Sequence, residues 1–264
     1  MYKAISLLVL SAALIAVALT ACSPQVAEEE TTDNSSIISA IDNSSPITKG
    51  NLITKTKTDE NGNINVNYFD TKGNLVENFV WDDDSKISHS VMTYSDTDKL
   101  MQKEELSPDG KQNKVESYRY DSEDNLQQKT VSEFEDGKLT VSTIYNSDDK
   151  LTSKSLSFYN DAGKLNKIER YDSQDVLEEY YTYEYNENGQ TVKYSAYNAD
   201  GSLLKYTLFE YNESGKLAFE RFYDKDDNSD GYYAFTYHES GTMKSSAKYN
   251  ADGKLLSEDL YEDK

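Results

Sequence analysis

From residue 46 onward, hydrophobic and polar positions recur in a short unit: an aromatic residue, Asn or Asp, two variable residues, Gly, Lys or Asn, and Leu. Clear copies begin at Tyr159, Tyr211 and Tyr249. Unit starts can be placed at residues 46, 58, 69, 81, 94, 106, 120, 133, 145, 159, 171, 185, 197, 211, 223, 237 and 249. From Tyr145 the spacing alternates between 14 and 12 residues, so the full period is 26 residues. A fixed period of this length predicts a repeat architecture.

The Gly position of the unit predicts a tight hairpin turn. It holds Gly in 11 of the 17 units, Asp in five, and Ser85 in one. Gly first and Asp next suit a residue with positive φ, which a three-residue hairpin loop needs after a type I turn. The Asn or Asp before it suits the first turn position, where its side chain can bond the backbone. If Asn250 and Lys254 close such a loop, Tyr249 and Leu255 become cross-strand neighbours.

The distance from each Leu to the next aromatic residue predicts which side chains share a face. Six residues separate Leu217 from Tyr223, and eight separate Leu203 from Tyr211. Because strands alternate faces with period 2, these even spacings place Leu and aromatic residue on one face. The odd spacings, such as 58 to 69 and 81 to 94, are expected to mark bulges or irregular hairpins.

These patterns together predict an all-β fold: a long antiparallel meander of repeated β-hairpins with about 16 strands of roughly 6 to 9 residues and a 26-residue two-strand period. Both faces mix apolar and charged residues, so a thick core is not expected. Such a sheet stays a single layer, curls on itself, or is covered by a partner. Its stability is then a sum over neighbouring repeats.

Residues 1–22 predict an export signal rather than part of the fold. Lys3 precedes an apolar stretch from Ile5 to Leu19, and small residues lead to Cys22. Leu19-Thr20-Ala21-Cys22 resembles the bacterial lipoprotein signal, which implies lipid attachment at Cys22 and a cell-envelope location. Residues 23–45 are small, polar and acidic, so we expect a disordered acidic tether. The repeat domain is then 46–264.

Composition narrows the classes of function. Acidic residues outnumber basic ones 48 to 27, giving a net charge of −21, which argues against nucleic acid as a partner. One Cys and two His cannot build a typical Cys/His zinc site. Low apolar content with high charge is typical of disorder, but aromatic residues at 12% indicate a folded domain.

The aromatic-Asn/Asp-x-x-Gly-x-Leu unit resembles the YD repeat of Rhs-type bacterial surface and toxin-shell proteins. It is also similar to the variant MORN repeats of some bacterial antitoxin-like proteins and lipoproteins. The resemblance covers residues 46–261 and implies a β-hairpin sheet. In the Rhs family such repeats enclose a toxin, and the residue after Gly is Arg; here it is usually Lys or Asn. We therefore expect a small lipid-anchored repeat protein instead of a toxin shell.

Few residues are candidates for catalysis or metal binding. His238 occupies the turn position after Tyr237, and His89 lies in a strand, so neither is expected to be catalytic. Asp226, Asn228 and Asp230 alternate as in a calcium loop, but Tyr237 stands where the closing Glu belongs. We interpret this segment as an acidic turn and a weak calcium candidate, and we expect no cofactor. The Lys residues after the turn Gly are expected to be solvated charges.

Exposed Tyr arrays can stack sugars or meet proteins, or they can simply stabilise a thin sheet through cross-strand pairs. We expect a non-enzymatic binding or adhesion scaffold at the surface or in the periplasm. Its partner would be a protein or a carbohydrate on the Tyr-rich sheet. The alternative is an immunity or antitoxin-like protein that masks a toxin. A carbohydrate-active enzyme remains a third hypothesis, because carboxylates are abundant.

Overall fold

The computed structural model describes residues 48–49, 51–82 and 85–263, and all regular structure in that part of the chain is β-strand. Cys22 and the proposed signal and tether lie outside the described residues. The strands are β1 (Thr48–Lys49), β2 (Leu52–Thr58), β3 (Ile64–Phe69), β4 (Leu75–Asp82), β5 (Ser85–Tyr94), β6 (Leu100–Leu106), β7 (Gln112–Tyr120), β8 (Leu126–Glu135), β9 (Lys138–Asn146), β10 (Leu151–Tyr159), β11 (Leu165–Tyr171), β12 (Leu177–Tyr185), β13 (Thr191–Asn198), β14 (Leu203–Tyr211), β15 (Leu217–Asp224), β16 (Ser229–Tyr237), β17 (Met243–Tyr249) and β18 (Leu255–Leu260).

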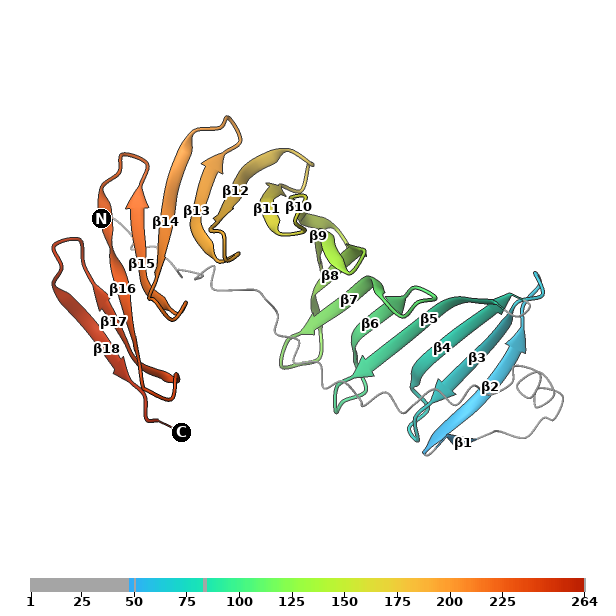
Figure 1. The fold of residues 1–264 in the computed structure, drawn as a ribbon. Coiled ribbons are helices and arrows are strands. Elements are labelled where there is room, and N and C mark those ends of the chain that lie inside the picture. Colours follow the sequence, from blue (N-terminus) through green and yellow to red (C-terminus); the bar gives the residue numbers. More distant parts are fainter. Residues whose placement is uncertain (1–47, 50, 83–84, 264) are drawn as a thin grey trace. The chain divides into compact units, whose positions relative to one another are not determined.

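Each strand pairs in antiparallel fashion with the next strand along the chain, which confirms the predicted all-β meander (Figure 1). Contacts between the described strands are likewise confined to consecutive ones. The strands therefore run back and forth between two rows of turns. We call the row with the turns at 160–164, 186–190, 212–216 and 238–242 the first edge. The row with the turns at 172–176, 198–202, 224–228 and 250–254 is the second edge.

The turns have the predicted geometry. The Asn250 amide donates to the Lys254 carbonyl at 3.0 Å, and the Gly253 amide donates back to the Asn250 carbonyl at 3.0 Å. The Asn250 side chain accepts from the Lys254 amide at 2.8 Å, and Gly253 has a φ of 76°. Tyr249 pairs with Leu255 as expected. The five Asp residues in the Gly position also adopt positive φ, between 58° and 64°.

The β4–β5 and β8–β9 hairpins depart from this pattern. Ser85 does not take the turn position expected of it: it begins β5 and pairs with Asp82, so this hairpin closes one step earlier than predicted. Glu135 pairs directly with Lys138, leaving a two-residue turn of Asp136 and Gly137 with φ of 50° and 74°. Two successive positive φ values define a type I′ turn. Both hairpins adjoin 13-residue unit spacings, 81 to 94 and 120 to 133, so the link between odd spacing and irregular hairpins is confirmed there.

The prediction that each Leu shares a face with the next aromatic residue is wrong. Tyr211 pairs with Leu217, but the neighbouring Glu210 pairs with Phe219, so Ala218 is skipped. This one-residue bulge reverses the face of everything after it, because faces alternate residue by residue. Leu217 and Tyr223 therefore lie on opposite faces. The same shift follows every turn after β3, from the β3–β4 hairpin to the β17–β18 hairpin.

The short 11-residue spacing from 58 to 69 is the informative exception. We expected a bulge there, but β2 and β3 pair without a shift, from Thr58 with Ile64 to Ile53 with Phe69. Ile64 and Phe69 are five residues apart, so they lie on opposite faces without any bulge. This unit lacks the one residue that forms the bulge in the other units. Its arrangement of faces is therefore the same as theirs.

The fully buried core is small, as expected of a thin sheet. The hydrophobic residues that are buried in the described part are Met92, Val115, Ala196 and Ala247. Ser195 is 1% exposed, and it lies beneath its larger same-face neighbours. A single layer leaves most side chains half-buried, because each contacts its own face only. Stability then comes from many similar contacts between adjacent strands.

Candidate binding surface on the tyrosine-rich strands

A ladder of tyrosine hydroxyls joins the hairpins along the first edge. Tyr159 donates to the Leu139 carbonyl at 2.8 Å, and Tyr211 donates to the Thr191 carbonyl at 2.8 Å. Tyr185 and Tyr237 make the same bond, at 2.5 and 2.8 Å, so the contact recurs every 26 residues. The tyrosine that opens each of these units therefore ties its hairpin to the one before it.

Three of the lysines that follow turn glycines also contact this ladder, so they do more than act as the expected solvated charges. Lys138, Lys164 and Lys216 lie 5.1 to 5.4 Å from the ring centres of the next first-edge tyrosines. Lys216 also donates to the Gly241 carbonyl at 2.8 Å. A cation over an aromatic ring is attracted by the negative face of the ring. These lysines therefore hold neighbouring hairpins together.

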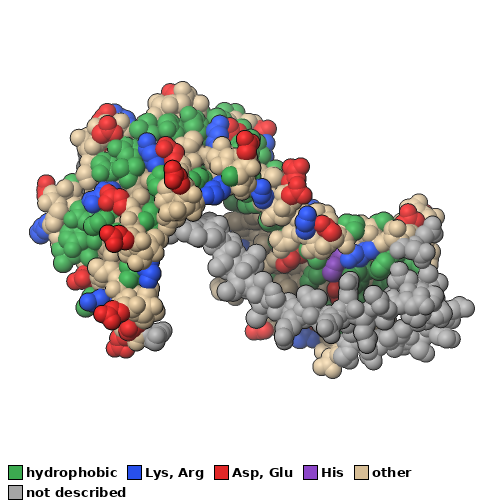
Figure 2. Space-filling model, viewed as in Figure 1, with side chains coloured by type: hydrophobic (Ala, Val, Ile, Leu, Met, Phe, Trp, Pro, Cys, Tyr) green, Lys and Arg blue, Asp and Glu red, His purple; other side chains and the backbone are tan. Residues whose placement is uncertain are grey.

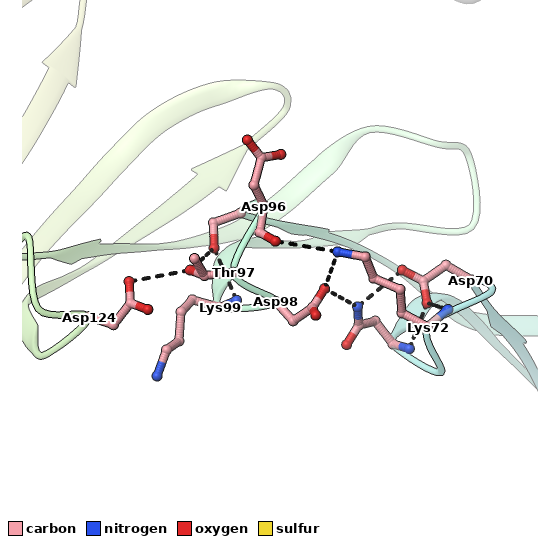
Figure 3. A network of polar contacts seen from close by, with 9 residues as sticks. Asp70, Lys72, Asp96, Thr97, Asp98, Lys99 and Asp124 are labelled. Atoms are coloured by element: carbon pink, nitrogen blue, oxygen red, sulfur yellow. Dashed lines mark hydrogen bonds and ion pairs between the residues drawn. The ribbon is translucent and has the colours of Figure 1, made fainter.

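Aspartates in the positive-φ position also join neighbouring hairpins, along the second edge. Asp98 accepts from the Lys72 Nζ at 2.8 Å and from the Asn74 Nδ2 at 3.1 Å, as Figure 3 shows. These hydrogen bonds lower the pKa of the Asp98 carboxyl. Asp124 accepts from the Thr97 hydroxyl at 3.3 Å in the adjoining hairpin (Figure 3). Asp149 and Asp175 bond Lys129 and Lys154 in the same manner, and Asp227 accepts from the Tyr206 hydroxyl at 3.0 Å.

Register divides the C-terminal strands into two faces, which we name by their residues. Face A carries Tyr181, Tyr183, Tyr194, Phe209, Glu220, Phe222, Tyr233 and Phe235. Face B carries Tyr180, Tyr197, Tyr206, Glu210, Phe219, Arg221, Tyr223, Tyr232 and Tyr249. Phe219 and Tyr233 lie on opposite faces. Figure 2 shows hydrophobic side chains gathered over these strands, with acidic and basic groups between them.

The tyrosines of face B are packed against the chain itself. Tyr206 and Tyr223 stack with ring centres 4.8 Å apart and planes 9° apart. The pairs Tyr180–Tyr197 and Tyr232–Tyr249 repeat this arrangement every 26 residues. From the preceding strand, Lys193 lies over Tyr206 at 5.0 Å; Lys167 and Arg221 cover Tyr180 and Tyr232. Tyr180, Tyr206 and Tyr232 each contact both a stacked tyrosine and a cation, so these rings act in cross-strand packing.

The aromatic residues of face A are packed more loosely. Tyr181 and Tyr194 have ring centres 5.6 Å apart, and Phe222 meets Tyr233 edge-on at 5.9 Å. Burial raises the pKa of the Tyr183 and Tyr194 hydroxyls. All contacts among the described strands are between neighbours in the sheet, so in this part of the chain no second layer covers face A. A half-buried aromatic surface of this kind is suited to docking a partner.

Glu220 lies among these rings. Its cross-strand neighbours are Phe209 on β14 and Tyr233 on β16. Burial raises the pKa of the Glu220 carboxyl, and among the described residues it has neither a hydrogen bond nor an ion pair to offset that burial. By sequence alone, Glu220 is one of 48 acidic residues. The one feature in the sequence that distinguishes Glu220 is its position between Phe219 and Phe222. That position becomes informative only when the register is known.

The histidines are explained by local structure. His89 bonds Glu77 at 2.9 Å and stacks on Phe79 at 4.1 Å. His238 has the predicted turn position, since its amide donates to the Thr242 carbonyl, and its ring bonds the Tyr261 carbonyl at 2.9 Å. Neither histidine has a serine or threonine hydroxyl among these contacts.

Two of the three calcium candidates contact neighbouring residues of their own hairpin. Asp226 pairs with Lys225 at 2.7 Å, the Asn228 amide donates to Asp224 at 2.9 Å, and Asp230 is exposed in β16. In the part of the chain that the structure describes, no three His, Cys, Asp or Glu side chains are grouped to hold a metal ion. A helix with the length and apolarity to cross a membrane is also not found in those residues.

Comparison with known proteins gives structural likeness alone. No protein-family model matches the chain, and no curated protein matches it. A porin-like protein from Bacteroides uniformis is 10% identical over 80% of this chain and 90% of its own, with a TM-score of 0.37. A porin-like protein from Bacteroides vulgatus is 13% identical over 82% and 95%, with a TM-score of 0.24. TcdB2-TccC3 is 11% identical over 88% of this chain but 18% of its own, with a TM-score of 0.20. These scores are too low to carry a functional argument.

Proposed function

We propose that this protein is a non-enzymatic binding scaffold of the bacterial cell envelope, anchored by lipid at Cys22. The proposed partner is a protein or a carbohydrate that docks on the aromatic surface of face A. The observation that carries the proposal is the difference between the two faces of β12–β17. Face B pairs its tyrosines in near-parallel stacks with ring centres 4.7 to 4.8 Å apart, whereas the rings of face A lie 5.4 to 6.2 Å apart. No second layer covers either face in the described residues.

The architecture supports a binding role in a second way. Adjacent hairpins are joined through the edge ladders of Tyr, Lys and Asp side chains. The central residues of face A, such as Phe209, Glu220 and Phe222, take no part in these edge contacts. A rigid sheet that presents aromatic groups at low conformational cost is a suitable interface.

The binding role is tested with the full-length lipoprotein extracted in detergent. Envelope proteins and a glycan panel are offered to the wild type, to Phe222→Ser and to Phe158→Ser. Phe158 is 41% exposed and lies outside face A, so it is a matched control. We expect a partner to be retained by Phe158→Ser and lost by Phe222→Ser, with both variants folded by circular dichroism. Equal capture by the two variants, or no specific capture by the wild type, contradicts the proposal.

The anchor is tested separately by Cys22→Ala. Because lipid chains hold a protein at a bilayer by burying CH₂ groups, their loss is expected to release the chain from the membrane fraction. Processing at residue 22 should stop as well, and metabolic labelling with a fatty acid should disappear. A Cys22→Ala chain that is still processed and still partitions with membranes contradicts lipid anchoring, without bearing on face A.

A further inference from the structure

On face B, an arginine of the chain itself contacts a carboxylate and two aromatic rings. The Arg221 Nε donates to the Glu210 carboxylate at 2.6 Å. The guanidinium lies 4.5 Å from the Phe219 ring centre and 5.0 Å from that of Tyr232. One planar cation therefore satisfies a carboxylate and covers two aromatic rings, which a guanidinium does better than an ammonium group.

Face A also brings a carboxylate and aromatic rings together, but no cation of the described residues pairs with that carboxylate. Glu220 is flanked across the sheet by Phe209 and Tyr233, and burial without a compensating partner raises its pKa. Lys248 contacts the Tyr233 ring at 5.7 Å and forms no ion pair with Glu220. Lys205 lies at the far end of β14, opposite Asp224. A half-buried carboxylate without a counter-charge is unfavourable, and an added cation would relieve it.

The charge of the chain favours a cationic occupant over a neutral sugar. Its formal net charge of −21 attracts basic partners over distance and repels acidic ones. A sugar hydroxyl could donate to Glu220 but would leave the carboxylate charge uncompensated. An arginine side chain provides a counter-charge, two parallel donors and a flat surface for the rings.

We propose that the part of face A around Glu220 binds an arginine side chain presented by a basic protein partner. The guanidinium lies between the Phe209 and Tyr233 rings and donates to the Glu220 carboxylate, as Arg221 does to Glu210 on the other face. This inference rests on the proposed binding function and specifies its partner chemistry.

The probe is a capped pentapeptide with a central Arg between two Leu residues, compared with analogues that carry citrulline or Lys at the centre. Each is titrated into the full-length protein with Phe and Tyr side chains isotopically labelled for NMR. We expect the Arg peptide to shift the Phe209 and Tyr233 resonances and to bind more tightly than both analogues. Citrulline has the same shape without the charge, so equal binding of citrulline overturns the proposal. Absence of any shift at the highest peptide concentration also overturns it.

Two matched variants locate the site. Glu220→Gln keeps the size of the side chain and removes its charge, and it should weaken the Arg peptide by about tenfold or more. Glu210→Gln makes the same change on face B and should leave the affinity unchanged. Equal weakening by both variants indicates general electrostatic attraction and overturns the proposal. An oligosaccharide that shifts the same rings more strongly than the Arg peptide overturns it in favour of a sugar site.

The envelope-capture experiment separates this inference from the proposed function. If Phe222→Ser loses a partner that Glu220→Gln still captures normally, face A is a binding surface but Glu220 is not an arginine site. If neither the wild type nor any variant captures a partner, the proposed function itself fails.

Discussion

The middle strands β7–β10 and the C-terminal strands β12–β17 share one backbone plan but differ on face A. Continued through the register, face A in the middle carries mostly small hydroxyl residues near the strand centres, together with Val115, Phe134 and Ile144. The hydroxyl residues are Ser117, Thr130, Ser132, Ser142, Ser155 and Ser157. The same face in β12–β17 carries Tyr and Phe, with Glu220 among them. Yet the first-edge ladder is the same in both regions, since Tyr159 and Tyr211 make equivalent bonds of 2.8 Å.

The two regions differ in the side chains that the sheet exposes, but not in the features that build the sheet. Turns, bulges and edge ladders recur in both regions, so they are sufficient to specify the hairpin repeat. The residues of face A vary without changing that repeat. The fold does not require this difference, and for that reason we propose β12–β17 as the binding region.

The largest expected effect comes from a glycine that is special to the C-terminal region. Gly231 has a φ of 107°, and a Cβ there would lie 2.4 Å from the Tyr249 carbonyl oxygen. Gly231→Ala combines backbone strain with a clash against backbone and should cost about 3 kcal/mol. Because contacts are between neighbours, hydrogen exchange should quicken in β15–β17 and stay slow in β7–β10.

The control for that variant is Gly62→Ala. Gly62 also has a positive φ, of 89°, but nothing lies within 4 Å of its Cβ position, so only the backbone cost of about 1–2 kcal/mol applies. If the two variants lose the same stability, the close approach at Gly231 has no energetic weight. If Gly231→Ala loosens β7–β10 equally, the two regions do not respond separately.

Alkaline pH should destabilise the protein through its tyrosines. The hydrogen bond from Tyr171 to Glu169 raises the pKa of Tyr171 to about 12, and burial raises the pKa of Tyr183 and Tyr194. Unfolded tyrosines titrate near 10, so above that pH the unfolded state binds fewer protons than the folded state. The free energy of unfolding must then fall as pH rises from about 10 to 12, whereas below 10 this contribution is fully present.

Urea midpoints between pH 8 and 11, with tyrosinate absorbance as the readout, measure this effect. Tyr171→Phe should flatten the decline, because it removes one of the raised pKa values. A midpoint that stays constant from pH 9 to 11 would show that the buried hydroxyls do not affect stability.

The smallest expected effect tests whether the first edge is common to both regions. Tyr159→Phe and Tyr211→Phe each remove one hydroxyl that donates to a carbonyl at 2.8 Å, and each should cost about 1 kcal/mol. Equal losses by urea denaturation would confirm that the edge ladder works independently of face A. A much larger loss for Tyr211→Phe would mean that face A packing supports the edge, and the separation between scaffold and surface would fail.

Much of the fold was predictable because turn chemistry is local. Gly and Asp at the positive-φ position, and Asn at the first turn position, depend on conformations that single residues prefer, and both are found where expected. Ser85 was misplaced because its hairpin closes with one residue fewer, a choice made by strand pairing. Glu220 could not be recognised, because its importance depends on which residues lie across from it.

The sequence by itself determined the hairpin repeat, its 26-residue period and its turns, since each rests on the backbone preferences of a few adjacent residues. The tertiary structure alone decided which side chains share a face. A bulge of one residue after each turn beyond β3 shifts the register, and a shift of one moves a side chain from one face to the other. That shift separates Phe219 from Phe222, gives Glu210 its arginine, and leaves Glu220 among aromatic rings without one.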